Sequence, residues 1–192
     1  MRAALGAALL ALLVVAGCDL LSGPSSAESA RPAAANPIPN FSTQPLSGTI
    51  ITIYLPRLFS DGSLGLAAAQ RGIPAQDDQL AASLQALIQG PSGDERADDY
   101  EVALDRRTQV VALQREGDAA LMTFDENLAR VRGRPYSELV YWAIVYTATE
   151  APGVQRVGLL QQDRPLLQFG YPAVTIAARA SRSDAPSWVY PR

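Results

Sequence analysis

Three residue types that carry much of protein chemistry are absent or nearly absent from this sequence. The 192 residues include no histidine and no lysine, so all 16 basic residues are arginines. The commonest general base and metal ligand near neutral pH is therefore missing, and a serine nucleophile has no ordinary base to activate it. Zinc likewise lacks its usual nitrogen and sulfur ligands, because Cys18 is the only cysteine. We expect no catalytic residue, no metal site and no cofactor.

Positive charge is also scarce. The formal net charge is −3, the sequence pI is near 5.0, and the arginines are scattered rather than clustered. A surface of this kind does not neutralise phosphates, which excludes nucleic acid as the expected partner. The length suits one domain with a hydrophobic core.

The N-terminus has the pattern of an export signal. Met1-Arg2 gives a positive start, and residues 3–17 are all apolar or small. This run is shorter than the roughly 20 residues that cross a bilayer as a helix. Val15–Cys18 resembles the lipobox of bacterial lipoproteins, in which the signal (residues 1–17) is removed, the cysteine sulfur receives a diacylglycerol and the new amine is acylated. Cys18 is the predicted lipid attachment site.

The alternative is an ordinary secretory signal with an incidental cysteine. The lipoprotein interpretation is favoured because the position, the flanking residues and the uniqueness of Cys18 all agree with it. Two or three acyl chains give durable attachment to a membrane. We expect the anchor on the outer face of the cytoplasmic membrane, or in the outer membrane of a double-membrane bacterium; Asp19 resembles an inner-membrane retention signal of some such bacteria.

A tether and a folded part follow the signal. Residues 18–48 are rich in proline, alanine and serine with no sustained periodicity, which predicts a disordered tether. As a coil of about 30 residues it spans roughly 30 Å. We place the folded domain at residues 49–170 and a C-terminal tail at residues 171–192.

The folded part alternates strand and helix patterns. Asp77 or Asp78 is the expected cap of a helix that ends at Gly90-Pro91, and Ser137 is the expected cap of a buried helix over residues 137–150. Residues 64–71 fit a strand, although their alanines suit a helix equally well. A hairpin is expected with its turn at residues 116–118. The other expected elements are strands at 49–56 and 154–161, a turn with a short strand at 164–169, and an acidic loop at 92–101.

This order, ββαββαβ, predicts an α+β fold. We expect an open two-layer sandwich in which two helices cover one face of a mostly antiparallel sheet.

The order of motifs resembles the GerMN domain, the sporulation and spore germination family. The similarity is carried by Gly90-Pro91, by the segment Phe124–Leu128, and by a helix that runs into Pro152-Gly153-Val154 and then Val157. It covers residues 49–168. The resemblance implies an exported, membrane-tethered protein with a compact α/β domain that has no established enzymatic activity and works in envelope assembly.

Two functions follow from this resemblance. The first is a non-catalytic module that binds an envelope protein or a second copy of itself. The alternative is a wall-associated domain that binds peptidoglycan glycans, with cleavage of them as the weaker variant.

A few side chains are candidates for contact with a ligand or partner. A glycosidase needs a pair of carboxylates, and the candidates are Asp125 and Glu126, with Glu138 or Glu150. Each of these residues is also expected as a helix cap, a turn former or a partner of a helix dipole. Aromatic residues stack on sugars as well as on each other. We interpret the helical aromatics mainly as core and expect Tyr136 and Tyr141 to be partly exposed. The carboxylates of residues 94–101 suit calcium but lack the loop pattern, which favours a solvated acidic loop.

Overall fold

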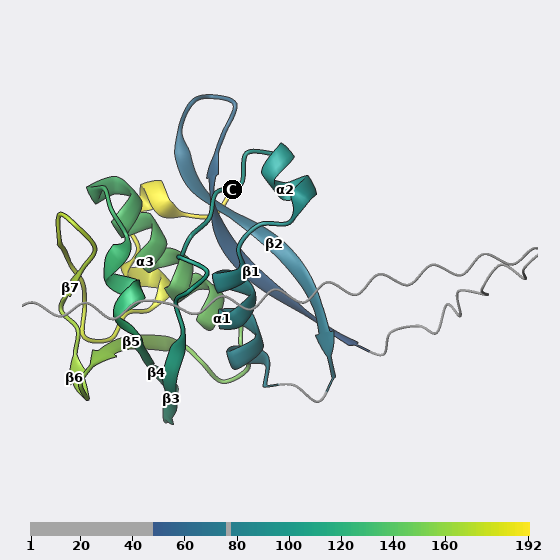
Figure 1. Cartoon of the computed structure of the whole chain (residues 1–192). Coiled ribbons are helices and arrows are strands. Elements are labelled where there is room, and N and C mark those ends of the chain that lie inside the picture. The colour runs from purple at the N-terminus through teal and green to yellow at the C-terminus, as the bar shows by residue number, and fades with distance from the viewer. Residues whose placement is uncertain (1–47, 76–77) are drawn as a thin grey trace, which may run out of the picture. The chain divides into compact units, whose positions relative to one another are not determined.

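The fold begins with a long β-hairpin. The computed structural model describes residues 48–75 and 78–192, so the signal, Cys18 and almost all of the expected tether lie outside it. Strands β1 (Gly48–Leu58) and β2 (Leu64–Pro74) pair antiparallel along their whole length. This pairing settles the open choice at residues 64–71 in favour of a strand. Figure 1 shows the hairpin beside helix α1, with its turn at the top of the view.

Helix α1 (Gln79–Gln89) forms as its sequence pattern predicts. Asp78 is the N-cap and accepts a hydrogen bond from the Leu80 backbone at 2.9 Å. Gly90 ends the helix with φ of 75°, a conformation that glycine adopts without steric cost. The four expected apolar residues are all buried, which fixes the face that packs on β1 (Leu80, Leu84, Leu87, Ile88).

The expected acidic loop contains a short helix, α2 (Gly93–Ala97). Ser92 and Glu95 form a capping box, in which each side chain accepts a hydrogen bond from the other residue's backbone amide. Glu95 also receives two hydrogen bonds from Arg71 on β2, both 2.6 Å long. This ion pair attaches α2 to the hairpin and holds the pKa of Glu95 below its ordinary value. The Ser-x-x-Glu pattern was a readable signal for this helix.

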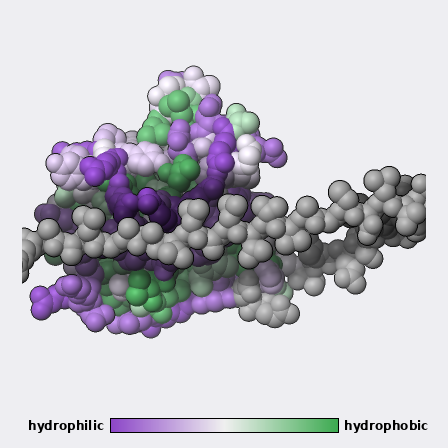
Figure 2. All heavy atoms as spheres, viewed as in Figure 1, coloured by the Kyte–Doolittle hydropathy of each residue, from purple (hydrophilic) through white to green (hydrophobic). Residues whose placement is uncertain are grey.

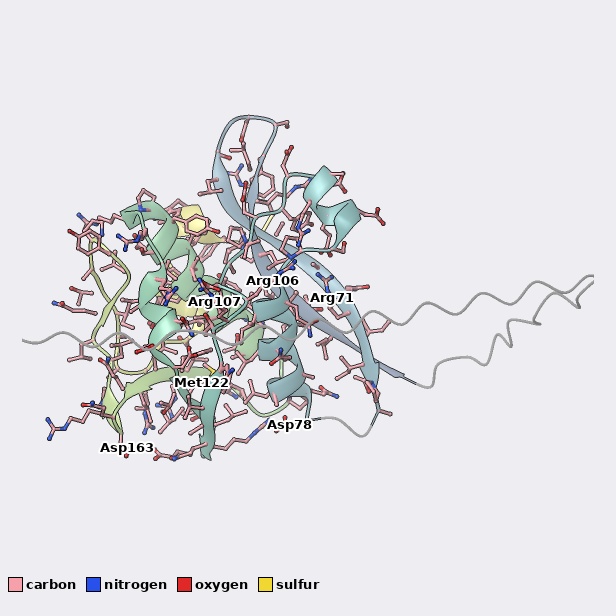
Figure 3. All side chains as sticks on the ribbon, viewed as in Figure 1. Arg71, Asp78, Arg106, Arg107, Met122 and Asp163 are labelled. Atoms are coloured by element: carbon pink, nitrogen blue, oxygen red, sulfur yellow. The ribbon has the colours of Figure 1, made fainter. Side chains whose placement is uncertain are left out.

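A second sheet forms around helix α3. Strands β3 (Val110–Glu116) and β4 (Ala119–Phe124) make the expected hairpin. After the 3₁₀ helix η1 (Glu126–Arg130) and α3 (Arg134–Ala148), strand β5 (Arg156–Gln161) returns parallel to β4. Strand β6 (Arg164–Pro165) follows a tight turn whose Asp163 is labelled in Figure 3. The sheet order is β3-β4-β5-β6.

The last residues pack against the domain. Strands β7 (Gln168–Phe169) and β8 (Val174–Thr175) form a small hairpin, and the 3₁₀ helices η2 (Arg182–Asp184) and η3 (Ser187–Val189) follow. Ala180 exchanges two 2.8 Å backbone hydrogen bonds with Val157 of β5. The Arg182 guanidinium donates to the Tyr146 carbonyl at 2.9 Å and to Thr149 Oγ1 at 2.7 Å, at the negative end of the α3 dipole.

The α+β class predicted from the sequence is confirmed, and the sheets are mostly antiparallel. The strands are divided among three sheets, however, rather than gathered in one. The core lies between these sheets and the two longer helices, and α3 is buried almost all round, as its composition predicts. Within residues 48–75 and 78–192, no helix has both the length and the apolar composition required to cross a membrane.

Candidate functional site

A groove opens at the carboxyl ends of the parallel strands β4 and β5. Its volume is about 190 Å³. In open α/β sheets, ligands bind outside the carboxyl ends of parallel strands, so this position makes the groove a candidate site. It lies between the segment that follows β4, the end of β5 and strand β7 (Phe124, Asp125, Glu126, Leu128, Ala129, Leu160, Gln161, Leu166, Gln168, Phe169, Gly170).

Both predicted carboxylates line this groove, but they differ in how they are held. Asp125 is the N-cap of η1 and accepts hydrogen bonds from the Asn127 backbone at 3.2 Å and from its Nδ2 at 2.8 Å. Glu126 is exposed and makes no hydrogen bond or ion pair with any residue that the structure describes. Asp125 therefore stabilises the local fold, while Glu126 is available to a ligand.

Gly170 lies close against α3 on the β7 side of the groove. Its φ is 74°, and a Cβ atom added there would lie less than 3.0 Å from both Oγ and Cβ of Ser137. Ser137 itself is fully buried within α3, and its hydroxyl has no partner among the described residues. The prediction that Ser137 caps this helix is wrong. The helix begins at Arg134, three residues earlier, after Gly133 and with Pro135 in its first turn, where proline's fixed φ favours helix initiation.

The two candidate tyrosines lie in different surroundings. Tyr136 is half-buried, and its hydroxyl donates to the Val102 carbonyl, which attaches the start of α3 to the segment before β3. Burial, with a smaller contribution from Glu101, raises the pKa of Tyr136 to about 12. Tyr141 is only 3% exposed, so the prediction that it is partly exposed is wrong. Its ring packs on Trp142 and Phe169, at centroid distances of 5.1 and 6.2 Å.

Tyr141 nevertheless borders a second pocket, of about 340 Å³. Strand β7 borders the groove and its partner β8 borders this pocket, so the small hairpin contributes to both. Three residues of α3 and six residues of the tail form its wall (Glu138, Tyr141, Trp142, Val174, Thr175, Ile176, Ala177, Asp184, Pro186).

The carboxylates considered for a glycosidase pair do not share one site. Asp125 and Glu126 border the groove, whereas Glu138 borders the second pocket. Glu150 lies at the other end of α3, where it accepts a hydrogen bond from the Tyr54 hydroxyl at 2.7 Å and one from Arg182 at 2.5 Å. Among the described residues, no three carboxylate, histidine or cysteine side chains gather in a geometry that suits a metal ion.

Comparison with known proteins agrees with this fold. The model of a family described as sporulation and spore germination, Germane, matches residues 52–167, more than half of the chain. The chain belongs to the Germane family.

Solved structures show the Germane fold in other proteins. The first GerMN domain of the Bacillus subtilis sporulation protein GerM has a TM-score of 0.59 at 15% identity, covering 71% of this chain and 99% of that one. The tandem GerMN domains of GerM have a TM-score of 0.56 at 18% sequence identity, and the match covers 70% of this chain and 46% of that one. A candidate lipoprotein from Clostridium perfringens has a TM-score of 0.50 at 15% sequence identity, and the match covers 71% of this chain and 89% of that one. No curated protein matches the chain.

Residues beyond the Germane match contribute to both hollows. The match ends at residue 167, whereas Gln168, Phe169 and Gly170 border the groove and residues 174–186 supply most of the second pocket. The sequence gives weak signals for this arrangement, because the tail forms contacts with residues far away in the chain. The Ser-x-x-Asp spacing of Ser181 and Asp184, which forms a capping box, was the one local pattern that indicated an ordered tail.

Proposed function

We propose that this protein is a lipid-anchored, non-catalytic interaction module of the cell envelope, and that it binds an envelope protein through the open edge of β3. One observation carries the proposal: the four-stranded sheet ends at β3, whose outer side pairs with no strand in the part of the chain that the structure describes. An open edge of this kind accepts an extended segment of a partner as an additional strand.

The register of the hairpin identifies the groups that face outward. Glu116 pairs with Ala119 across the two-residue turn Gly117-Asp118, so these two residues form a hydrogen-bonded pair. Hydrogen-bonded and non-bonded pairs alternate along an antiparallel ladder. The backbone N–H and C=O groups of Leu113 and Arg115 therefore point away from β4 and are free to pair with a partner strand.

The two sides of this sheet are protected differently. On the far side, Ala180 of the tail pairs with Val157 of β5, and the two-residue strand β6 pairs with the last two residues of β5. On the near side, β3 is seven residues long and carries Val111, which is 66% exposed. Proteins usually shield long edge strands, because an exposed apolar edge promotes pairing with another chain. An edge left open in this way is consistent with a docking function.

The proposed anchor depends on the sequence and on the family. Cys18 follows an export signal and stands at the predicted lipobox, and a Clostridium perfringens relative is a candidate lipoprotein. The segment between Cys18 and Gly48 is long enough to hold the domain clear of the lipid headgroups. Intact-mass measurement should show an acylated N-terminal cysteine, and Cys18→Ser should release the protein from the membrane fraction. An unmodified sulfhydryl, or a mature chain that begins elsewhere, would contradict the anchor.

Cross-linking in the native membrane tests the docking edge. The full-length protein should capture a discrete protein partner, and Val111→Lys should reduce capture at least fivefold, because a charged side chain on an open strand disfavours pairing. Ile50→Lys is the matched control, since Ile50 is also an exposed β-branched residue, 69% exposed, but on β1. Equal capture by both variants would refute the assignment to β3.

Binding to wall glycans is the second candidate, and the groove favours it. The groove places the carboxylate of Glu126 and the side-chain amides of Gln161 and Gln168 beside two phenylalanines, Phe124 and Phe169. Polar groups of this kind bind sugar hydroxyls, and aromatic side chains pack against the faces of sugar rings. This function predicts sedimentation with purified cell wall and a reduced bound fraction for Glu126→Gln. Tyr141→Ala is a poor test, because Tyr141 is buried in the core. Capture of wall fragments alone would reverse our order of preference.

A further inference from the structure

The fold gathers three arginines on one surface, although the arginines are scattered along the sequence. Arg130, Arg132 and Arg134 are all exposed and lie where η1 passes into α3. The sequence has no carboxylate between Glu126 and Glu138, which border the groove and the second pocket respectively. Seven other arginines form ion pairs, but these three form none with any residue that the structure describes. Their positive charge is therefore available to a partner.

The β7–β8 hairpin is hydrogen-bonded to the segment that carries these arginines. The Tyr171 amide donates to the Val131 carbonyl at 3.0 Å, and the Gly133 amide donates to the Tyr171 carbonyl at 2.8 Å. The Arg132 guanidinium lies over the Tyr171 ring, 5.8 Å from its centroid. The hairpin belongs to a second stretch without carboxylates, residues 164–183. Two segments that lack acidic residues thus form one continuous surface.

The turn of this hairpin adds an exposed apolar part to the surface. Tyr171 is 67% exposed, more than any other aromatic side chain in the described part of the chain, and Pro172 and Ala173 are exposed beside it. Tyrosine rings are enriched at the headgroup level of membranes, and guanidinium groups bind phosphate oxygens through parallel hydrogen bonds. We refer to these six residues as the arginine–tyrosine surface (Arg130, Arg132, Arg134, Tyr171, Pro172, Ala173).

The predicted tether is long enough to bring this surface to a bilayer. The described part of the chain begins at Gly48, and the end of α3 lies near that strand, because Ile50 and Glu150 border the same small hollow. The start of α3 is about 22 Å further along the helix. Figure 1 shows β7 and the start of β1 on opposite sides of the domain. About 30 residues between Cys18 and Gly48 reach at most about 100 Å, which exceeds this separation several-fold.

The charge of the protein favours one orientation at an anionic surface. The chain has a formal net charge of −3, so an anionic bilayer repels most of the domain and attracts the arginine–tyrosine surface. Each arginine near such a bilayer contributes about fivefold to partitioning. Three arginines are too few to hold a protein that diffuses freely, but a tether keeps the surface at a high effective concentration beside the lipid. A weak surface is then sufficient.

We propose that the arginine–tyrosine surface docks on the anionic phospholipid headgroups of the membrane that holds the Cys18 anchor. The inference rests on the proposed anchor and is independent of the β3 edge. Docking fixes one orientation of the domain, in which the start of α3 and the β7–β8 turn contact the bilayer and the start of β1 faces away from it.

A single fluorescent label measures the docking. Cys18 is the only cysteine and acylation consumes its sulfur, so Ala173→Cys adds one reactive thiol. The mature full-length chain is reconstituted into vesicles that contain nitroxide-labelled lipid, made of phosphatidylcholine alone or with about 30% phosphatidylglycerol. We expect quenching at residue 173 to be at least threefold stronger with phosphatidylglycerol, and about 0.5 M NaCl to remove most of the difference. Ser60→Cys, in the exposed β1–β2 turn, is the control position and should show no such difference.

Paired variants connect the quenching to the arginines. Arg132→Gln with Arg134→Gln should lower the phosphatidylglycerol-dependent quenching at least fivefold, because two of the three charges are lost. Arg96→Gln with Arg156→Gln removes the same charge from α2 and from the start of β5, and should leave the quenching unchanged. Thermal unfolding confirms that each variant folds. Equal quenching at residues 60 and 173, or equal losses in the two double variants, would overturn the proposal.

Flotation separates failure of the docking from failure of the anchor. A chain that floats with both kinds of vesicle but shows no phosphatidylglycerol-dependent quenching at residue 173 would refute the docking alone. A chain without acyl groups that floats only with phosphatidylglycerol vesicles would refute the anchor alone, and a chain that floats with neither would refute both. Equally tight binding to soluble polyphosphate would assign the surface to a polyanion and reject the lipid.

Discussion

Replacing Gly170 with alanine tests how tightly the small β7–β8 hairpin is packed against α3. Two costs act together at this position. The positive φ of 74° disfavours any residue with a Cβ atom, by about 1–2 kcal/mol. The new methyl group also overlaps Ser137 Oγ and Cβ, which are fully buried within α3 and have little room to move. Overpacking of this kind costs about 1–3 kcal/mol.

The expected loss of unfolding free energy is therefore about 2–5 kcal/mol. Gly62 provides a matched control, because its φ is 77° but nothing lies within 4 Å of an added Cβ. Gly62→Ala should cost only the backbone part, about 1–2 kcal/mol. The difference between the two variants isolates the steric contact between the hairpin and the helix.

Thermal unfolding followed by near-ultraviolet circular dichroism measures both variants in the full-length protein. One kcal/mol corresponds to roughly 2–4 °C for a domain of this size. We expect Gly170→Ala to lower Tm by at least about 2 °C more than Gly62→Ala does. Equal shifts would refute the close packing of Gly170 on Ser137, and with it the position of β7 at the groove.

Three further outcomes follow from single contacts. Glu95→Gln should destabilise the protein at pH 7 and make its stability fall less steeply in acid. Arg71 lowers the folded-state pKa of Glu95, so the stabilisation from this carboxylate is complete above the unfolded-state pKa and disappears as the pH falls through the folded-state pKa. An unchanged loss of stability in acid would contradict the pairing of Glu95 with Arg71. Arg182→Ala should lower the free energy of unfolding by about 1–3 kcal/mol, because it removes hydrogen bonds at the end of α3. Arg179→Ala removes only an exposed ion pair and should lower it by at most about 1 kcal/mol. Equal losses in urea unfolding would show that the contact of Arg182 with α3 is weak. Asp163→Gly should raise Tm, with a gain of about 0.5–1 kcal/mol in the free energy of unfolding, because Asp163 has a φ of 59°, which glycine adopts more readily. A lower Tm would contradict the conformation of this turn.

Local patterns predicted the elements that local interactions determine. Helix α1 follows from the Asp78 cap, four apolar residues on one face and Gly90, and the structure places each of them as expected. The β3–β4 turn follows from Gly117, whose φ of 61° fits the first position of a type II′ turn. In each case the decisive contacts join residues close together in the sequence.

The errors arose where distant contacts decide the structure. Ser137 has the chemistry of a cap, but packing against Gly170 makes it an interior residue, and the helix extends back to Arg134. Tyr141 has a polar end suited to a surface, but Phe169 and the tail cover its ring. The groove was predictable only in part: Asp125 and Glu126 were identified from the sequence, whereas their position beside β7 depends on how the hairpin folds back onto α3.

The pairing of Ala180 with Val157 limits the valency of the molecule. With the outer side of β5 covered by β6 and by Ala180 of the tail, the described part of the chain has one long edge to contribute through this sheet. Two copies joined through β3 would use up both edges and stop at a closed, two-fold pair, since fibre growth needs a free edge at each end. A C-terminal truncation before residue 180 would expose the second edge and convert a self-limiting contact into one that can polymerise.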